Sequence, residues 1–392
     1  MIWKHWSERG RRISPVLSIL TCSLILLAPS CEKEILIVPS EGYSWPENNR
    51  TYWPTEAWEL SDMEDHGIDP SKMSLADEFA ENDSLARALL VIKDGYIVFE
   101  KYYDEGGVNE STDVWSVTKS YSSALVGLLM DQKVIQSTSQ LMADLLPAYP
   151  EFKDITLHHV LTMTTGLSWQ ESGGVWVEWI FSDDWLAHAL ALGQEREPGE
   201  AFFYSSANSH FLTSMVYYMT GIKPGTLAKE KLFDPMGIPF DTLDHTIIYQ
   251  NWNEYQIPMN QTWRQDTRGI ETASFGLYMT ARDMAKFGYL YLNKGRWEDR
   301  QLISENWVLN STRDHETNIY GRYSYGYQWY LTLVAGKPVF MASGFGGQVI
   351  GVVPSQDLVL VLKYEAETPV HPESGSAHDD MHLFELVVKS LI

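Results

Sequence analysis

Hydrophobic and polar positions alternate differently at the two ends of the chain and in its middle. Two apolar runs, residues 88–92 and 96–99, flank an Asp-Gly turn and predict a β-hairpin. Apolar runs near the C-terminus predict four more strands, at residues 327–334, 339–343, 348–353 and 358–363. Helical spacing of apolar residues predicts helices over residues 116–132, 158–164, 208–220, 281–293 and 381–392.

This order of elements predicts an α+β fold. Because strands lie at both ends of the domain and helices between them, we expect one antiparallel sheet built from both chain ends and flanked by helices. An all-helical region, roughly residues 120–320, would be inserted into the sheet region. No linker or repeat interrupts the sequence after residue 60, so residues 61–392 are predicted to form one domain.

The first thirty residues have the pattern of an export signal. Lys4, Arg9, Arg11 and Arg12 precede an apolar run over residues 16–27, which is followed by small residues and Cys31. The apolar run is too short to span a bilayer comfortably, so a cleaved signal peptide is favoured over an uncleaved anchor. The segment resembles a bacterial lipoprotein signal, which implies lipidation of Cys31 and a membrane-anchored protein in the periplasm or on the cell surface.

The segment after the signal, residues 31–60, is rich in Pro, Glu, Asn and Trp without a period and is predicted to be a tether. The whole chain of 392 residues carries a formal charge of −23. The signal contributes +3 (four basic residues against Glu8), which leaves −26 on the remainder. A surface this acidic argues against a nucleic-acid partner, because phosphate binding requires a basic face. The two cysteines, Cys22 and Cys31, cannot build a disulfide framework.

Candidate chemistry begins at Ser116-Val117-Thr118-Lys119. On a helix this spacing places the serine and the lysine on one face, where a lysine with a lowered pKa can remove the serine proton. The motif alone is weak, since Ser30 and Lys33 repeat it at the expected cleavage site. The chain contains no Gly-X-Ser-X-Gly, so an α/β-hydrolase nucleophile elbow is not expected, whereas a Ser-His-Asp triad remains open.

Two further segments carry candidate site residues. Tyr204, in Phe203-Tyr204-Ser205-Ser206, becomes a base only near a cation such as Lys119, since its ordinary pKa is about 10. The glycines of Ser343-Gly344-Phe345-Gly346, on or beside an edge strand, would let a substrate backbone approach and a free N–H complete an oxyanion hole. Taken singly, Tyr204 is better interpreted as a packed aromatic residue, and the glycines as a bulge or turn.

In this order the motifs resemble those of the penicillin-recognising serine hydrolases, above all the class C β-lactamase-like branch with its esterases, D-aminopeptidases and nylon-oligomer hydrolases. The likeness covers residues from about 70 to 392 and includes 161–167, 198–200 and 278–285. It implies that Ser116 is the acylated nucleophile and that Lys119 and Tyr204 form one coupled acid/base unit. It also implies an oxyanion hole from the Ser116 and Phe345 N–H groups, with Ser206, Gly344 and Gly346 contacting substrate.

Two departures from the β-lactamase pattern refine the expected activity. Ala342 stands where β-lactamases have the lysine that meets a substrate carboxylate, and Ser206 stands where they have asparagine. We therefore expect a hydrolase of amides or esters, acting on a small or peptide-like substrate that lacks this carboxylate. The alternatives are a penicillin-binding carboxypeptidase or β-lactamase, and a catalytically silent peptide-binding relative.

Other conspicuous residues are given no catalytic role. His158-His159 has no accompanying set of Asp, Glu or Cys ligands. His378 and His382 lie beside Asp379 and Asp380 but lack the glutamate of an HEXXH-type zinc site, so no metal and no cofactor are predicted. The family likeness places a tryptophan-rich stretch beside the substrate cleft, and a packed core is an equally good interpretation. Its tryptophans are Trp169, Trp176, Trp179 and Trp185.

Overall fold

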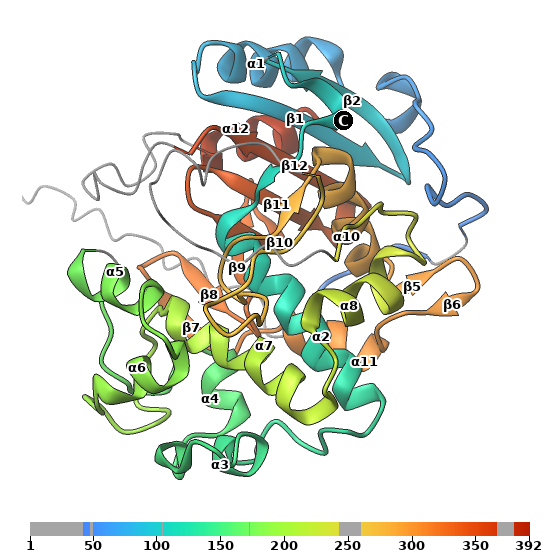
Figure 1. The fold of residues 1–392 in the computed structure, drawn as a ribbon. Coiled ribbons are helices and arrows are strands. Elements are labelled where there is room, and N and C mark those ends of the chain that lie inside the picture. Colours follow the sequence, from blue (N-terminus) through green and yellow to red (C-terminus); the bar gives the residue numbers. More distant parts are fainter. Residues whose placement is uncertain (1–41, 48–49, 104, 172, 243–259, 367–379) are drawn as a thin grey trace, which may run out of the picture. The chain divides into compact units, whose positions relative to one another are not determined.

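The computed structural model (Figure 1) describes residues 42–47, 50–103, 105–171, 173–242, 260–366 and 380–392. The predicted signal peptide, the predicted lipidation site Cys31 and His378 lie outside these residues.

The centre of the fold is an eight-stranded antiparallel sheet with the strand order β2-β1-β12-β11-β10-β9-β8-β7. The N-terminal hairpin pairs with the last strand, with Leu90 opposite Val361, so both chain ends build one sheet as predicted. The strands are β1 (Ala86–Lys93), β2 (Tyr96–Tyr102), β7 (Glu316–Ile319), β8 (Tyr323–Tyr325), β9 (Tyr330–Val334), β10 (Lys337–Gly344), β11 (Gln348–Val353) and β12 (Leu358–Tyr364).

Helices cover both faces of this sheet, which explains why its central strands are continuously apolar rather than alternating. On one face, α1 (Pro70–Glu81) and α12 (Asp380–Lys389) pack on side chains such as Leu89 and Leu360. On the other face, α10 (Ala281–Leu292) packs on β1, β11 and β12, and α2 (Thr118–Asp131) packs on β10, in the core that includes Leu90. The α+β class with an antiparallel sheet and flanking helices is therefore confirmed.

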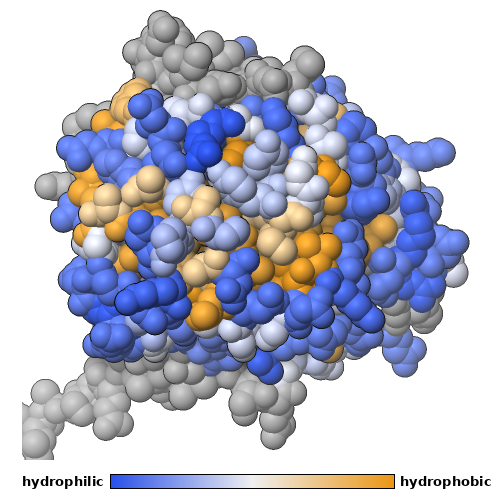
Figure 2. Space-filling model, turned by 60° about the horizontal axis from the view of Figure 1, so that its bottom comes forward, coloured by the Kyte–Doolittle hydropathy of each residue, from blue (hydrophilic) through white to orange (hydrophobic). Residues whose placement is uncertain are grey.

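The inserted region between β2 and β7 is mainly helical; its helices α3 to α7 lie in the lower part of Figure 1, whereas α10 lies higher, against the sheet. Figure 2 views the molecule from that side and shows a broken band of hydrophobic residues between hydrophilic ones. No helix in the described part of the chain is long and apolar enough to cross a membrane. The further helices are α3 (Met142–Leu145), α4 (Leu157–Leu161), α5 (Gly174–Ile180), α6 (Trp185–Ala191), α7 (Ser206–Thr220), α8 (Pro224–Ala228) and α11 (Glu305–Ser311).

Short elements connect these helices and strands. Strand β3 (Thr112–Asp113) pairs with β4 (Tyr278–Met279), and β5 (Arg296–Trp297) pairs with β6 (Arg300–Gln301). A π-helical turn spans Lys229–Phe233. The 3₁₀ turns span Glu64–His66, Gly107–Asn109, Trp115–Val117, Pro150–Phe152 and Pro354–Gln356.

Residues 42–47 and 50–60, expected to belong to a tether, contact the domain in the structure. Arg50 donates hydrogen bonds to both carboxylate oxygens of Asp357, at the β11–β12 turn, and to Asn293. Trp58 is only 7% exposed and contacts the ring of Tyr289 on α10. The large apolar surface of the tryptophans explains this packing, which composition alone did not predict.

Candidate active site

Ser116 lies in a strained turn at the entry to α2. Residues 115–117 form a 3₁₀ turn, so α2 begins at Thr118 rather than at the predicted residue 116. Trp115 adopts a left-handed backbone with φ of 50°, which costs energy for a residue with a side chain. Its N–H is held by the Asp113 carboxylate at 2.8 Å, and the same oxygen accepts the Gly276 N–H at 2.9 Å. Asp113 thereby fixes the turn that presents Ser116.

Asp113 itself is buried and has a perturbed acidity. Burial raises its pKa to about 7, although the hydrogen bonds from the Trp115 and Gly276 N–H groups oppose this rise. Nothing in the local sequence distinguished this aspartate from a surface residue. Its role arises from the pairing of β3 with β4, which brings Gly276 and the nucleophile turn to one carboxylate.

Lys119 follows Ser116 by one helical turn, and its ammonium group contacts the serine hydroxyl. The Nζ atom lies 2.8 Å from Ser116 Oγ, 3.3 Å from Ser206 Oγ and 3.1 Å from the Ser274 carbonyl oxygen. The residue is 2% exposed, and this burial lowers the Lys119 pKa to about 8, against the opposing charges of Glu171 and Asp113. A lysine in this state supplies a substantial neutral fraction near neutral pH.

Tyr204 lies beside Lys119, in the segment that precedes α7. The Lys119 Nζ atom is 4.8 Å from the centre of the Tyr204 ring. Burial and the nearby Glu171 charge raise the Tyr204 pKa well above 10, although the neighbouring Ser116 hydroxyl opposes this rise. The phenol is therefore neutral and suited to donate a proton. Tyr330 stacks beside it at 6.4 Å between ring centres.

Glu171 is a site residue that the sequence analysis missed. Its carboxylate accepts hydrogen bonds from the Ser206 N–H at 2.9 Å, the Ser206 hydroxyl and the Trp169 indole N–H at 2.5 Å. Ser206 is the first residue of α7, so a carboxylate here also meets the positive end of the helix dipole. The one sign of Glu171 in the sequence was an acidic residue within the tryptophan-rich stretch.

The glycine segment after β10 passes close to the nucleophile turn. A Cβ atom on Gly344 would lie 2.4 Å from the Val114 carbonyl oxygen and 3.2 Å from the Ser116 nitrogen, so only glycine permits this approach. Gly346 has φ of 76°, and a Cβ there would meet Ala366 at 2.8 Å. The Phe345 ring packs edge-on against Trp115, with ring centres 5.3 Å apart.

The prediction of an edge strand at this segment is wrong in one respect. Strand β10 lies inside the sheet, between β11 and β9. However, its pairing with β9 ends at Met341, whereas its pairing with β11 continues to Gly344. Residues 342–344 are therefore unpaired on the β9 side only, a local edge that arises because β9 is shorter than β10.

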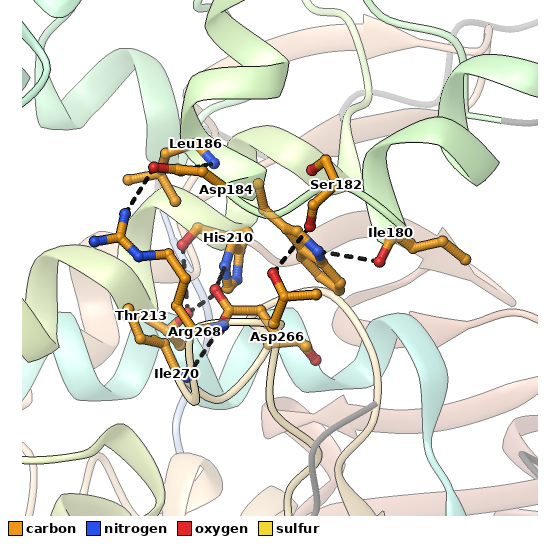
Figure 3. Close-up of polar contacts among 12 residues, drawn as sticks. Ile180, Ser182, Asp184, Leu186, His210, Thr213, Asp266, Arg268 and Ile270 are labelled. Carbon is orange, nitrogen blue, oxygen red and sulfur yellow. Dashed lines mark hydrogen bonds and ion pairs between the residues drawn. The ribbon is translucent and has the colours of Figure 1, made fainter. Parts of the chain in front are cut away.

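The Ser274 carbonyl belongs to a hairpin-like loop, residues 262–279, that is fastened to the helical region (Figure 3). His210 on α7 contacts Asp266 at 3.0 Å, and both side chains are at most 1% exposed. Arg268 contacts Asp184 at 2.7 Å, and the Thr267 hydroxyl donates to the Ser182 carbonyl. The hydrogen bond from His210 lowers the Asp266 pKa although burial alone would raise it.

Among the described contacts, the pair of His210 and Asp266 does not join Ser116 in a Ser-His-Asp arrangement. The hydroxyl beside His210 belongs to Thr213, at 3.4 Å, and its side chain is completely buried. The pair thus serves to hold the loop, while the described contacts of Ser116 are with the lysine and the tyrosine. No three His, Cys, Asp or Glu side chains within the described ranges could hold a metal ion together.

The tryptophan-rich stretch is mostly core. Trp169, Trp179 and Trp185 are at most 3% exposed, and they contact one another with ring centres 4.2 to 5.2 Å apart. Trp176 is half-buried and contacts Phe275. Of the two interpretations, core packing thus accounts for three of the four tryptophans.

Comparison with known proteins agrees with this geometry. A family model described as Beta-lactamase matches residues 74–377. The chain belongs to the beta-lactamase family. The family resemblance inferred from the motifs is thereby confirmed. A relative, an uncharacterized protein of Alkalihalophilus pseudofirmus, is 22% identical over 317 residues, which are 72% of this chain and 85% of that protein.

Solved structures share the fold of this beta-lactamase-family chain. A penicillin-binding protein homologue from Caulobacter crescentus has a TM-score of 0.60 at 17% identity, covering 83% of this chain and 99% of that chain. A D-stereospecific amidohydrolase from Streptomyces sp. has a TM-score of 0.57 at 18% identity, over 76% and 94% of the two chains. A family VIII carboxylesterase has a TM-score of 0.60 at 19% identity, over 82% and 97%.

Proposed function

We propose that this beta-lactamase-family protein is a serine hydrolase that cleaves an amide or ester bond through an acyl-enzyme at Ser116. The observation that carries the proposal is the 2.8 Å contact between Ser116 Oγ and a buried lysine whose pKa is lowered to about 8. A nucleophile paired with a base of this acidity is the arrangement that covalent catalysis requires.

In the acylation step, Ser116 Oγ attacks the substrate carbonyl carbon while its proton passes to the neutral Lys119 amine. The carbonyl becomes a tetrahedral oxyanion, which the Ser116 and Phe345 N–H groups would stabilise. When the intermediate collapses, the bond to the leaving group breaks, and that group takes a proton from the Tyr204 phenol. Lys119 then returns its proton to Tyr204, which restores both side chains. We assign the base to Lys119 because the Tyr204 pKa is raised and the lysine pKa is lowered.

Deacylation uses the same groups on a water molecule. The water attacks the acyl carbon, its proton passes to the neutral lysine, and Ser116 leaves as the alcohol after taking that proton. No metal or cofactor enters either step. Ala342, which stands where β-lactamases have a lysine that meets the substrate carboxylate, is 1% exposed and carries no charge. This supports a substrate without such a carboxylate.

The test is labelling with a fluorophosphonate, followed by a substrate panel. The wild-type chain should be labelled at Ser116, as located by peptide mass spectrometry, and Ser116→Ala should not be labelled. A panel of simple esters, D-amino-acid amides and a chromogenic cephalosporin then defines the bond. Absence of wild-type labelling refutes the proposed nucleophile, and faster turnover of the cephalosporin than of the esters refutes the proposed substrate class.

A further inference from the structure

The Lys119 amine contacts three polar groups, which differ in whether they can donate a hydrogen bond to it. Ser116 and Ser206 offer hydroxyls, whereas Ser274 offers a backbone carbonyl oxygen that can only accept. A protonated lysine can donate one N–H to each of the three. A neutral lysine has two N–H groups and one lone pair, so one partner must face the lone pair. The base works on Ser116 only when that partner is Ser116.

Ser206 would compete for this lone pair if its own proton were free. A serine hydroxyl has one proton, and the Ser206 proton is donated to the Glu171 carboxylate. The Ser206 oxygen can then only accept from Lys119. The two N–H groups of neutral Lys119 consequently go to Ser206 and Ser274, and the lone pair is left for Ser116.

Glu171 is well fixed for this task. Its second oxygen accepts two N–H groups, from the Ser206 backbone and from the Trp169 indole. Trp169 is 3% exposed and packs edge-on against Trp179, with ring centres 5.2 Å apart. Although Glu171 belongs to an exposed loop, both oxygens of its carboxylate accept hydrogen bonds, and these fix its orientation toward Ser206.

We propose that Glu171 is a positioning residue for the hydrolase reaction, because through Ser206 it directs the lone pair of neutral Lys119 toward Ser116 Oγ. The inference rests on the proposed function, since it assigns no bond chemistry of its own. The substitution Glu171→Gln removes the negative charge and should disrupt this arrangement of hydrogen bonds around Lys119. If the amide oxygen keeps the two N–H donors, the amide nitrogen faces Ser206 Oγ and turns the serine proton toward Lys119.

The charge of Glu171 has a second consequence, which gives the experiment its specific readout. The groups that face Lys119 are the hydroxyls of Ser116 and Ser206, the Ser274 carbonyl and the Tyr204 ring, with the charges of Glu171 and Asp113 nearby. Both carboxylates raise the Lys119 pKa, so removing the Glu171 charge lowers it. Because the lysine must be neutral, the acid limb of the rate profile moves to lower pH.

The experiment measures the rate of fluorophosphonate labelling of Ser116 across the pH range that spans the Lys119 pKa. Glu171→Gln should slow labelling at least about tenfold at the plateau, since positioned proton transfer contributes about 10²–10⁴-fold. It should also move the acid limb to lower pH. The matched control is Glu178→Gln, an exposed glutamate on α5, which should leave rate and profile unchanged. Asp113, with its pKa raised to about 7, titrates in all three proteins alike, so their difference isolates Glu171.

Ser206→Ala supplies a second variant that separates the hydrogen bond from the charge. It should slow labelling while moving the acid limb less than Glu171→Gln does, because the carboxylate remains. In the Ser206→Ala background, Glu171→Gln should cause little further loss of plateau rate, since the connection is already cut. Thermal melting checks that each variant is folded.

Two outcomes overturn the inference while the proposed function stands. One is wild-type rate and profile in Glu171→Gln while the wild-type chain is labelled at Ser116. The other is an equal loss from Glu171→Gln with and without Ser206, which would show that Glu171 does not act through this serine. Absence of labelling in the wild-type chain is a different result, because it refutes the proposed function itself.

Discussion

Gly344→Ala is expected to separate the nucleophile turn from strand β10. The added Cβ would lie 2.4 Å from the Val114 carbonyl oxygen, whereas carbon and oxygen atoms in such contacts normally stay about 3.3–3.6 Å apart. One of the two backbone segments must therefore move by about 0.9 Å or more. Both contacted atoms, the Val114 oxygen and the Ser116 nitrogen, are backbone atoms, so no side-chain rotation relieves the overlap.

The movement displaces one of the two N–H groups assigned to the oxyanion hole relative to the other. A misplacement of about 1 Å costs on the order of 10²-fold in rate, which corresponds to about 2.7 kcal/mol of transition-state stabilisation. Overpacking adds a loss of about 1–3 kcal/mol in the free energy of unfolding. The measurements are kcat/KM on the best ester of the panel, the fluorophosphonate labelling rate, and urea unfolding.

Gly351→Ala is the matched control. It adds the same methyl group to the neighbouring strand β11, where the Cβ would lie 2.4 Å from Phe384 Cε1 on the α12 face of the sheet. Its unfolding free energy should fall by a similar amount, yet kcat/KM per folded molecule should stay near that of the wild type. Wild-type activity in Gly344→Ala would refute the reasoning, as would an equal loss of activity in Gly351→Ala.

Three further outcomes are expected. Asp266→Asn should lower the unfolding free energy by about 1.5–3 kcal/mol near neutral pH, the usual contribution of a hydrogen bond to a charged group. Because the Asp266 pKa is lowered in the folded state, the stability difference between wild type and variant has its full size above the unfolded pKa of about 3.9. It shrinks as pH falls through the lower pKa of the folded state. A stability difference in urea unfolding that does not change with pH would contradict this prediction. A chain beginning at residue 61 should unfold with at least about 3 kcal/mol less free energy than one beginning at residue 42, because buried Trp58 is lost, and equal melting curves would contradict this. Cys31→Ser should abolish incorporation of an alkyne-labelled fatty acid in a bacterial host, and persistent labelling would rule out Cys31 as the lipid site.

The sheet was predictable because its strands carry their signal locally. Residues such as Leu89 and Leu90 face opposite layers and are both buried, so each central strand is a compact apolar run between turn residues. The short strands β7 and β8 were not predicted, since they are brief and lie at the far edge of the sheet. The interior position of β10 was also missed, because strand order depends on which distant segments pair.

The same distinction applies to the site. Ser116 and Lys119 are one helical turn apart, so spacing alone brings them together, and the motif likeness supplied Tyr204. Asp113 and Glu171 act through partners 163 and 35 residues away, Gly276 and Ser206. Neither contact leaves a local pattern, because each is created by the packing of a loop against a distant element.

The charges around Ser116 form a consistent set once Glu171 is included. In a site that binds a substrate carboxylate, a fixed cation must offset the charge of that carboxylate, and a second anion nearby would oppose its binding. Here Ala342 supplies no cation, and Lys119 must lose its proton to act as a base. Glu171 adds a negative charge close enough to raise the pKa values of Lys119 and Tyr204. The carboxylate that we propose to orient the base would therefore also disfavour an anionic substrate, which agrees with the uncharged residue at position 342.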